Sequence, residues 1–204
     1  MKTFSFALAA ATLATAPALA EPQIGKAAPN FKLKDASGRI VTLSDYRGKT
    51  VVLEWNNPEC PFVKKHYDSG NMQKTQAAAA KDGVVWLTIN SSAPGKQGHV
   101  SGAQAKSVIA ALRAQPSAYL LDPKGVVGKG YSAKTTPHMY VINPRGTLVY
   151  NGGIDDKPTK RKEDIQRARN HVLAALGELK AGKSVSVPTS RPYGCAVKYQ
   201  DSVE

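Results

Sequence analysis

Residues 51–67 read VVLEWNNPECPFVKKHY and predict the change from a buried strand to a helix around which the fold is built. The apolar run 51–53 is typical of a strand, and the segment 56–58 (Asn-Asn-Pro) favours a turn. Cys60 follows this turn, and Pro61 fits the first turn of a helix, where its missing N–H has no partner to lose. Helix N-termini favour thiolates, so we expect Cys60 to be a nucleophile with a lowered pKa, helped by Lys64, Lys65 and His66 nearby.

The chain has one further cysteine, Cys195, close to its far end. Cys195 could resolve an oxidised Cys60, or the two could form a permanent disulfide that pins the tail over the site. Such a staple would add up to roughly 5 kcal/mol in the chain-entropy model. Cys60 could also be a buried, unreactive small hydrophobe, but the polar residues 56–59 before it argue for reactivity.

The first 20 residues of the 204 have the features of a signal peptide. Lys2 precedes an apolar stretch over 4–16, and Ala-Leu-Ala at 18–20 is an A-x-A cleavage site before Glu21. We therefore expect an exported protein, periplasmic or secreted, with no stable membrane insertion, because no later stretch is long enough to span a bilayer. We expect one domain over 21–180 and a tail over 181–204 that carries Cys195.

The formal net charge of +13 favours anionic partners or surfaces, and a solvated basic surface is the simpler interpretation. An exported protein is not expected to bind nucleic acid. The basic stretch 157–169 could be a partner surface, but we favour a solvated helix face. Two distant cysteines and four scattered histidines match no metal-ligand spacing, so we expect no metal and assign no role to His66 or His138.

The pattern of apolar and turn-forming residues predicts an α/β fold with a mixed central sheet and helices on both faces. The expected hairpin covers 31–43, and the next strand covers 50–55. A helix over 61–81, with Gly70 as its weak point, leads to a buried strand over 84–89. Further elements are expected as helices at 103–114, 126–131 and 163–179 and strands at 118–121, 139–142 and 147–150.

This order, with a cysteine after the first core strand and Thr136-Pro137 before the final hairpin, resembles the thioredoxin fold. The added N-terminal hairpin resembles the redoxin (peroxiredoxin-like, AhpC/TSA) branch. Glu-Cys-Pro-Phe-Val at 59–63 and Tyr-Gly-Cys-Ala-Val-Lys-Tyr at 193–199 are similar to segments of its exported members. The resemblance implies a cis Pro137, with Thr136 offering backbone groups to a substrate. It also implies a cell-envelope oxidoreductase that uses Cys60 and Cys195, acts on protein thiols, disulfides or peroxide, and needs a reductant but no cofactor.

Two positions depart from the family pattern. Val63 stands where a Cys-x-x-Cys site has its second cysteine, and Asn57 stands where a peroxiredoxin has its peroxide-binding threonine. The site is therefore incomplete without Cys195, and the oxidant stays open between a peroxide and a protein disulfide. The alternative from a different class is a redox-inert binding or scaffold domain in which a Cys60–Cys195 disulfide is structural.

Overall fold

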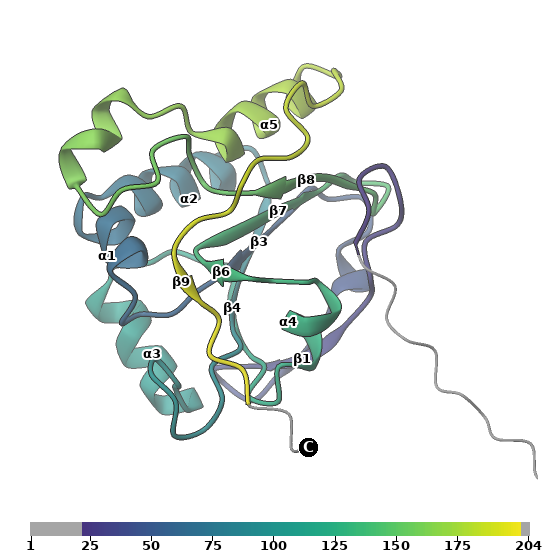
Figure 1. The fold of residues 1–204 in the computed structure, drawn as a ribbon. Coiled ribbons are helices and arrows are strands. Elements are labelled where there is room, and N and C mark those ends of the chain that lie inside the picture. The colour runs from purple at the N-terminus through teal and green to yellow at the C-terminus, as the bar shows by residue number, and fades with distance from the viewer. Residues whose placement is uncertain (1–21, 201–204) are drawn as a thin grey trace, which may run out of the picture.

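A seven-stranded mixed sheet forms the centre of the molecule, in a computed structural model that describes residues 22–200 (Figure 1). The expected signal peptide at 1–20 lies outside the described residues. The sheet has the spatial order β2-β1-β5-β4-β3-β7-β8. Its strands are β1 (Lys32–Asp35), β2 (Ile40–Thr42), β3 (Val51–Trp55), β4 (Val85–Asn90), β5 (Ala118–Leu121), β7 (His138–Ile142) and β8 (Leu148–Gly152).

The middle of the sheet is parallel and its two edges are antiparallel. β3 runs parallel to β4, and β4 runs parallel to β5. β7 and β8 form an antiparallel hairpin beside β3, and the β1–β2 hairpin pairs with β5 at the other edge. This is the expected mixed α/β sheet. The parallel pairing places the carboxyl ends of β3, β4 and β5 at the same end of the sheet.

Helices cover both faces because the apolar residues of the central strands alternate between them. Val52 and Val141 pack with α1 (Pro61–Asp68), α2 (Asn71–Lys81) and α5 (His171–Lys180) on one face. Leu53 packs on the other face, in a core that includes residues of α4 (Val126–Gly130) and the entry segment. α3 (Gly102–Ala111) packs against β5, where Ala105 and Tyr119 belong to one buried cluster. No helix within 22–200 combines the length and apolar character needed to cross a membrane.

Two predicted helices are shorter than expected. The helix predicted over 61–81 is divided into α1 and α2 because Gly70 has φ +75°, a left-handed conformation that interrupts a helix. The helix predicted over 163–179 begins only at His171. A 3₁₀ turn, η2 (Lys162–Arg167), precedes it, Ala168 is extended, and Asn170 caps α5 by accepting a hydrogen bond from the Leu173 N–H. A second 3₁₀ turn, η1 (Leu43–Tyr46), follows β2.

A buried carboxyl fixes α1 on the sheet. Glu54 of β3 is 0% exposed and accepts hydrogen bonds from Tyr67 of α1 and from Trp86 and Thr88 of β4. Burial raises its pKa, and these donors partly offset the effect. The helix α1, whose N-cap is Cys60, is thereby held to β3 and β4.

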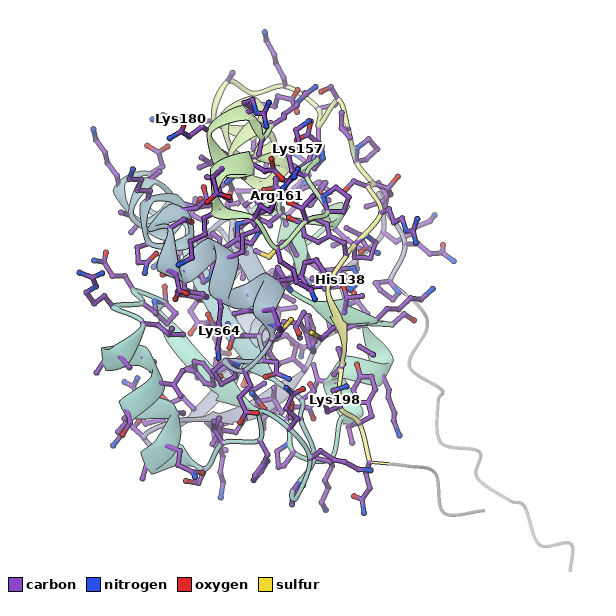
Figure 2. The ribbon with its side chains drawn as sticks, turned by 60° about the vertical axis from the view of Figure 1, so that its left-hand side comes forward. Lys64, His138, Lys157, Arg161, Lys180 and Lys198 are labelled. Carbon is purple, nitrogen blue, oxygen red and sulfur yellow. The ribbon has the colours of Figure 1, made fainter. Side chains whose placement is uncertain are left out.

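The tail returns across the molecule and adds a short strand of its own. Strand β9 (Cys195–Ala196) pairs antiparallel with β6 (Thr135–Thr136), and Figure 1 shows the yellow tail crossing the front of the sheet at this point. Beyond β9 the Lys198 carbonyl accepts a hydrogen bond from the Ala93 N–H (Figure 2). The Tyr199 hydroxyl donates to the Ala133 carbonyl. The described part of the tail is therefore held at β9 and again on the C-terminal side of Cys195.

Candidate active site

Cys60 lies just past the carboxyl end of β3 and begins α1. Its backbone is extended (φ −69°, ψ 125°), so it is the N-cap residue, and Pro61 occupies the first helical turn. Its N–H donates to the Asn57 carbonyl at 3.0 Å, which closes the turn between strand and helix. The side chain is 0% exposed. The polar loop before Cys60 therefore does not leave the thiol open to solvent.

The loop before β7 forms one wall around Cys60. The Thr136–Pro137 peptide bond is cis, and the Thr136 carbonyl oxygen lies 3.1 Å from the Cys60 sulfur. Both Thr136 and Cys60 are buried. The backbone of Thr136 thus lies where the sequence analysis expected a contact with a substrate chain.

Cys195 forms the rest of the wall. It pairs with Thr136 across β6 and β9, and its sulfur lies 2.8 Å from that of Cys60. Both cysteines are free, and Cys195 is the partly exposed one. The close approach depends on Gly194, where φ is +136° and any side chain would collide with the Thr136 carbonyl. The structure therefore brings together four residues singled out from the sequence: Cys60, Thr136, Pro137 and Cys195.

The two thiols differ in acidity. Burial raises the pKa of Cys60, but hydrogen bonds to its sulfur from the Cys195 thiol, the Thr136 hydroxyl and the Val63 N–H outweigh it, and the net pKa is below the ordinary value. The Thr136 carbonyl can accept only from a protonated Cys60 and so opposes ionisation. Burial and the neighbouring Cys60 raise the pKa of Cys195 to about 11. Cys60 is therefore the more acidic thiol of the pair, and Cys195 is the hydrogen-bond donor to it.

The two positions that depart from the family pattern have structural contacts. Val63 is fully buried against the core below α1. The Asn57 side chain accepts from the Glu59 N–H at 2.9 Å and donates to the Gln97 carbonyl at 3.3 Å. The amide of Asn57 thus braces the loop before Cys60, and these contacts do not direct it at the sulfur.

A group of residues that the sequence analysis did not assign lies beside the two thiols. Lys65 and His66 were expected to add positive potential at Cys60, but they contact Asp155 and Tyr193 instead. The burial of His66 could have been read from the sequence, since Val63, His66 and Tyr67 fall on one helical stripe. Asp155 and Tyr193 are far from α1 in the chain, and no local pattern pairs them with it.

A groove of 490 Å³ opens next to Cys195. Its lining includes Phe62, Thr135, Pro158, Arg191 and Gly194. A larger groove of 640 Å³ is lined in part by Thr50 and Asn143, at the opposite end of β3 from Cys60. Of these two grooves, the smaller one is lined by Gly194, the chain neighbour of Cys195.

The family follows from a match over most of the folded chain. Residues 24–151 match the AhpC/TSA family. The chain belongs to this family. Among curated proteins, none matches the sequence closely enough to count as a relative.

Solved structures show the same fold. An uncharacterised conserved protein from Geobacillus kaustophilus has a TM-score of 0.74 at 28% identity, covering 89% of this chain and 94% of its own. A hypothetical protein from Sinorhizobium meliloti has a TM-score of 0.73 at 23% identity, covering 88% and 96%. A putative thiol:disulfide interchange protein DsbE from Chlorobium tepidum has a TM-score of 0.56 at 25% identity, covering 77% and 100%. The fold of this AhpC/TSA protein is thioredoxin-like, and its family and neighbours indicate an oxidoreductase.

Proposed function

We propose that this protein is a thiol-dependent oxidoreductase in which Cys60 is the nucleophile and Cys195 the resolving thiol. One observation carries the proposal: two free sulfurs 2.8 Å apart, with the more acidic one at a helix N-terminus and against a cis-proline loop. A nucleophile needs thiolate character, and its resolution needs a second sulfur within reach. This pair offers both.

Thiol–disulfide exchange is the reaction that the site supports best. The Cys60 thiolate attacks one sulfur of a substrate disulfide, and the other sulfur leaves as a thiolate that takes up a proton. Cys195, once deprotonated, attacks the Cys60 sulfur of the mixed disulfide and expels the second substrate thiolate. The substrate disulfide is reduced to two thiols, and Cys60 and Cys195 become a disulfide. An external dithiol of unidentified source returns them to thiols.

Peroxide reduction is the second candidate. It is favoured by family membership. It is also favoured by the burial of Cys60, because a buried thiol is reached more easily by a small oxidant than by a protein disulfide. In that reaction the Cys60 thiolate attacks one peroxide oxygen, the O–O bond breaks, and the other oxygen leaves as hydroxide that takes up a proton to give water. The resulting Cys60 sulfenic acid then reacts with the Cys195 thiol to form the disulfide, with loss of a second water. It is disfavoured by Asn57, which stands in place of the peroxide-binding threonine and braces its own loop.

We place the protein in the cell envelope, periplasmic or secreted. The support is the signal-peptide pattern of residues 1–20, and a disulfide can persist in that compartment. Its partners would then be protein thiols and disulfides or a peroxide, and the domain boundary at 180 would separate the redoxin domain from a tail that completes the site.

The test offers reduced protein two oxidants in parallel, oxidised glutathione and hydrogen peroxide, and follows both cysteines by mass spectrometry. Thiol–disulfide exchange predicts a glutathione adduct on Cys60 in Cys195→Ser and a Cys60–Cys195 disulfide in the wild type. A peroxidase predicts rapid sulfenic acid on Cys60 in Cys195→Ser with peroxide. If Cys60 stays a thiol with both oxidants, neither reaction is its function.

The alternative from another class, a redox-inert scaffold, is separated by the reduction potential. A structural disulfide has a potential below about −300 mV and resists glutathione. A cycling pair would equilibrate with glutathione buffers. A potential far below that value, with no loss of the protein's activity in Cys195→Ser, favours the scaffold.

A further inference from the structure

Three ionisable side chains are buried together beside the two thiols. Lys65 and His66 of α1 are 1% and 0% exposed, and Asp155, in the loop after β8, is 3% exposed. Burying such groups is unfavourable unless they are paired and hydrogen-bonded. We call these three residues the Tyr193 socket, because the side chain they enclose is that of Tyr193.

The hydroxyl of Tyr193 joins the members of the socket. It donates to Asp155 Oδ1, and His66 Nε2 lies 3.0 Å from the same hydroxyl. The Lys65 ammonium lies 3.7 Å from Asp155 Oδ2 and 5.5 Å from the centre of the Tyr193 ring, and it donates to the Lys157 carbonyl at 2.7 Å. Asp155 and His66 thus contact the hydroxyl of Tyr193, and Lys65 contacts its ring.

The protonation state of His66 sets the direction of these hydrogen bonds. Burial and the neighbouring Lys65 charge lower the pKa of His66 to about 3, so the ring is neutral near pH 7. Asn71 Nδ2 lies 2.8 Å from His66 Nδ1 and can only donate, which leaves the ring proton on Nε2. His66 therefore donates to the Tyr193 oxygen, and Tyr193 donates to Asp155. The hydrogen bonds thus run in one direction, from Asn71 through His66 and Tyr193 to Asp155.

The Tyr193 socket connects both cysteines to one helix. Cys60 is the N-cap of α1, and Lys65 and His66 belong to a later turn of the same helix. Only Gly194 separates Tyr193 from Cys195. Phe62 of α1 also packs edge-on against Tyr193, with ring centres 5.9 Å apart. On the far side of Cys195 the β6–β9 pairing holds the tail.

We propose that Tyr193 is a positioning residue that, through its hydroxyl in the Lys65–His66–Asp155 socket, keeps the Cys195 thiol against Cys60. The inference rests on the proposed function, because it concerns the resolving step of that reaction. With the tail docked, Cys195 attacks from contact distance. With the tail undocked, the attack has to wait for the tail to return.

Docking affects the two redox forms unequally. In the disulfide form the S–S bond keeps the tail docked, so removing the Tyr193 hydroxyl costs this form the whole energy of the contact. In the dithiol form the tail can undock instead, so this form loses less and its docked fraction falls. Losing the hydroxyl therefore makes disulfide closure both slower and less favourable. A purely structural tyrosine would destabilise both forms alike and leave the redox equilibrium unchanged.

The experiment compares Tyr193→Phe with Tyr131→Phe. Tyr131 is also buried and donates through its hydroxyl, to the Pro29 carbonyl, but it is not in the tail. Each protein is equilibrated with reduced and oxidised glutathione: one oxidised glutathione and the protein dithiol give the protein disulfide and two reduced glutathiones. We expect a closure constant about tenfold lower in Tyr193→Phe, a potential about 30 mV less negative, and no change in Tyr131→Phe.

A kinetic measurement accompanies the equilibrium. After a pulse of oxidised glutathione, the Cys60–glutathione mixed disulfide should persist about tenfold longer in Tyr193→Phe than in wild type. An unchanged lifetime and potential in folded Tyr193→Phe overturn the proposal. If that variant does not fold, His66→Gln is measured, since its amide cannot reproduce both ring contacts; wild-type closure there also overturns it. If the wild type itself forms no Cys60–Cys195 disulfide, the proposed function fails instead.

Discussion

At the scale of single residues, the acidity of Cys60 depends on hydrogen bonds more than on charged neighbours. Lys65 and His66 follow Cys60 closely in the sequence, but both are committed to Asp155 and Tyr193. The strongest support for the thiolate comes from the Cys195 thiol. Cys195 thus lowers the pKa of Cys60 before a disulfide forms between them.

A matched pair of variants tests this coupling. Cys195→Ser keeps a hydroxyl donor next to Cys60, whereas Cys195→Ala removes it. A hydrogen bond to a charged group contributes about 1.5–3 kcal/mol, which corresponds to roughly 1–2 pKa units. The pKa of Cys60, measured by thiolate absorbance against a Cys60→Ser blank, should therefore be higher in Cys195→Ala by about that amount. Equal pKa values in the two variants would show that Cys195 does not support the thiolate.

The candidate site could be predicted from the sequence only where its signal is local. Cys60 is recognisable because strand, turn and Pro61 adjoin it, and Pro137 because Thr-Pro precedes an apolar hairpin. The partners of His66 and Lys65 could not be predicted in this way. Asp155 and Tyr193 reach them through the tertiary fold, and no local pattern indicates that Lys65 is buried.

At the scale of elements, the pairing of β9 with β6 depends on a single backbone conformation. Gly194 has φ +136°, and the Thr136 carbonyl occupies the space that a Cβ would need. Beyond Cys195, the Val197 N–H donates to the Lys134 carbonyl at 3.1 Å and extends the pairing. The strand that carries the resolving thiol therefore requires glycine at 194.

Replacing Gly194 by alanine should weaken the pairing of β9 with β6. The strain of an unfavourable backbone conformation is about 1–3 kcal/mol, so the Val197 amide should exchange its hydrogen roughly ten- to a hundredfold faster. Iodoacetamide should also modify Cys60 faster, because its cover is loosened. Gly182→Ala is the control, since Gly182 has φ +70° but open space around it. Unchanged exchange at Val197 would mean that β9 tolerates a side chain here.

Elements were easier to predict than their ends and their distant partners. The order of strands and helices follows from apolar periodicity, but the pairing of β1 with β5 joins segments far apart in the chain. The start of α5 depends on Asn170 as its N-cap. It also depends on Asp164, which accepts hydrogen bonds from Thr159 and Arg161 and so keeps η2 separate from the helix. Side-chain contacts of this kind override helix propensity, so the periodic pattern overestimated that helix.

At the scale of the whole molecule, two buried histidines link folding to pH. Burial lowers the pKa of His66 to about 3 and that of His138 to about 4. His138 is neutral within the fold and lies 2.8 Å from Asn151 Oδ1. In the unfolded chain both titrate near 6.5. Between pH 6.5 and 4 the unfolded chain therefore binds protons that the folded chain does not, and the free energy of unfolding falls as the pH falls.

We expect this loss to reach about 2 kcal/mol per pH unit between pH 6 and 4, because each proton contributes about 1.36 kcal/mol per unit. Burial also raises the pKa values of Glu54 and Asp122, and their protonation in the folded state opposes the loss. Urea unfolding at a series of pH values measures the slope. His138→Gln removes one titrating group and should roughly halve the histidine contribution. A slope that His138→Gln leaves unchanged would assign the acid sensitivity to other groups.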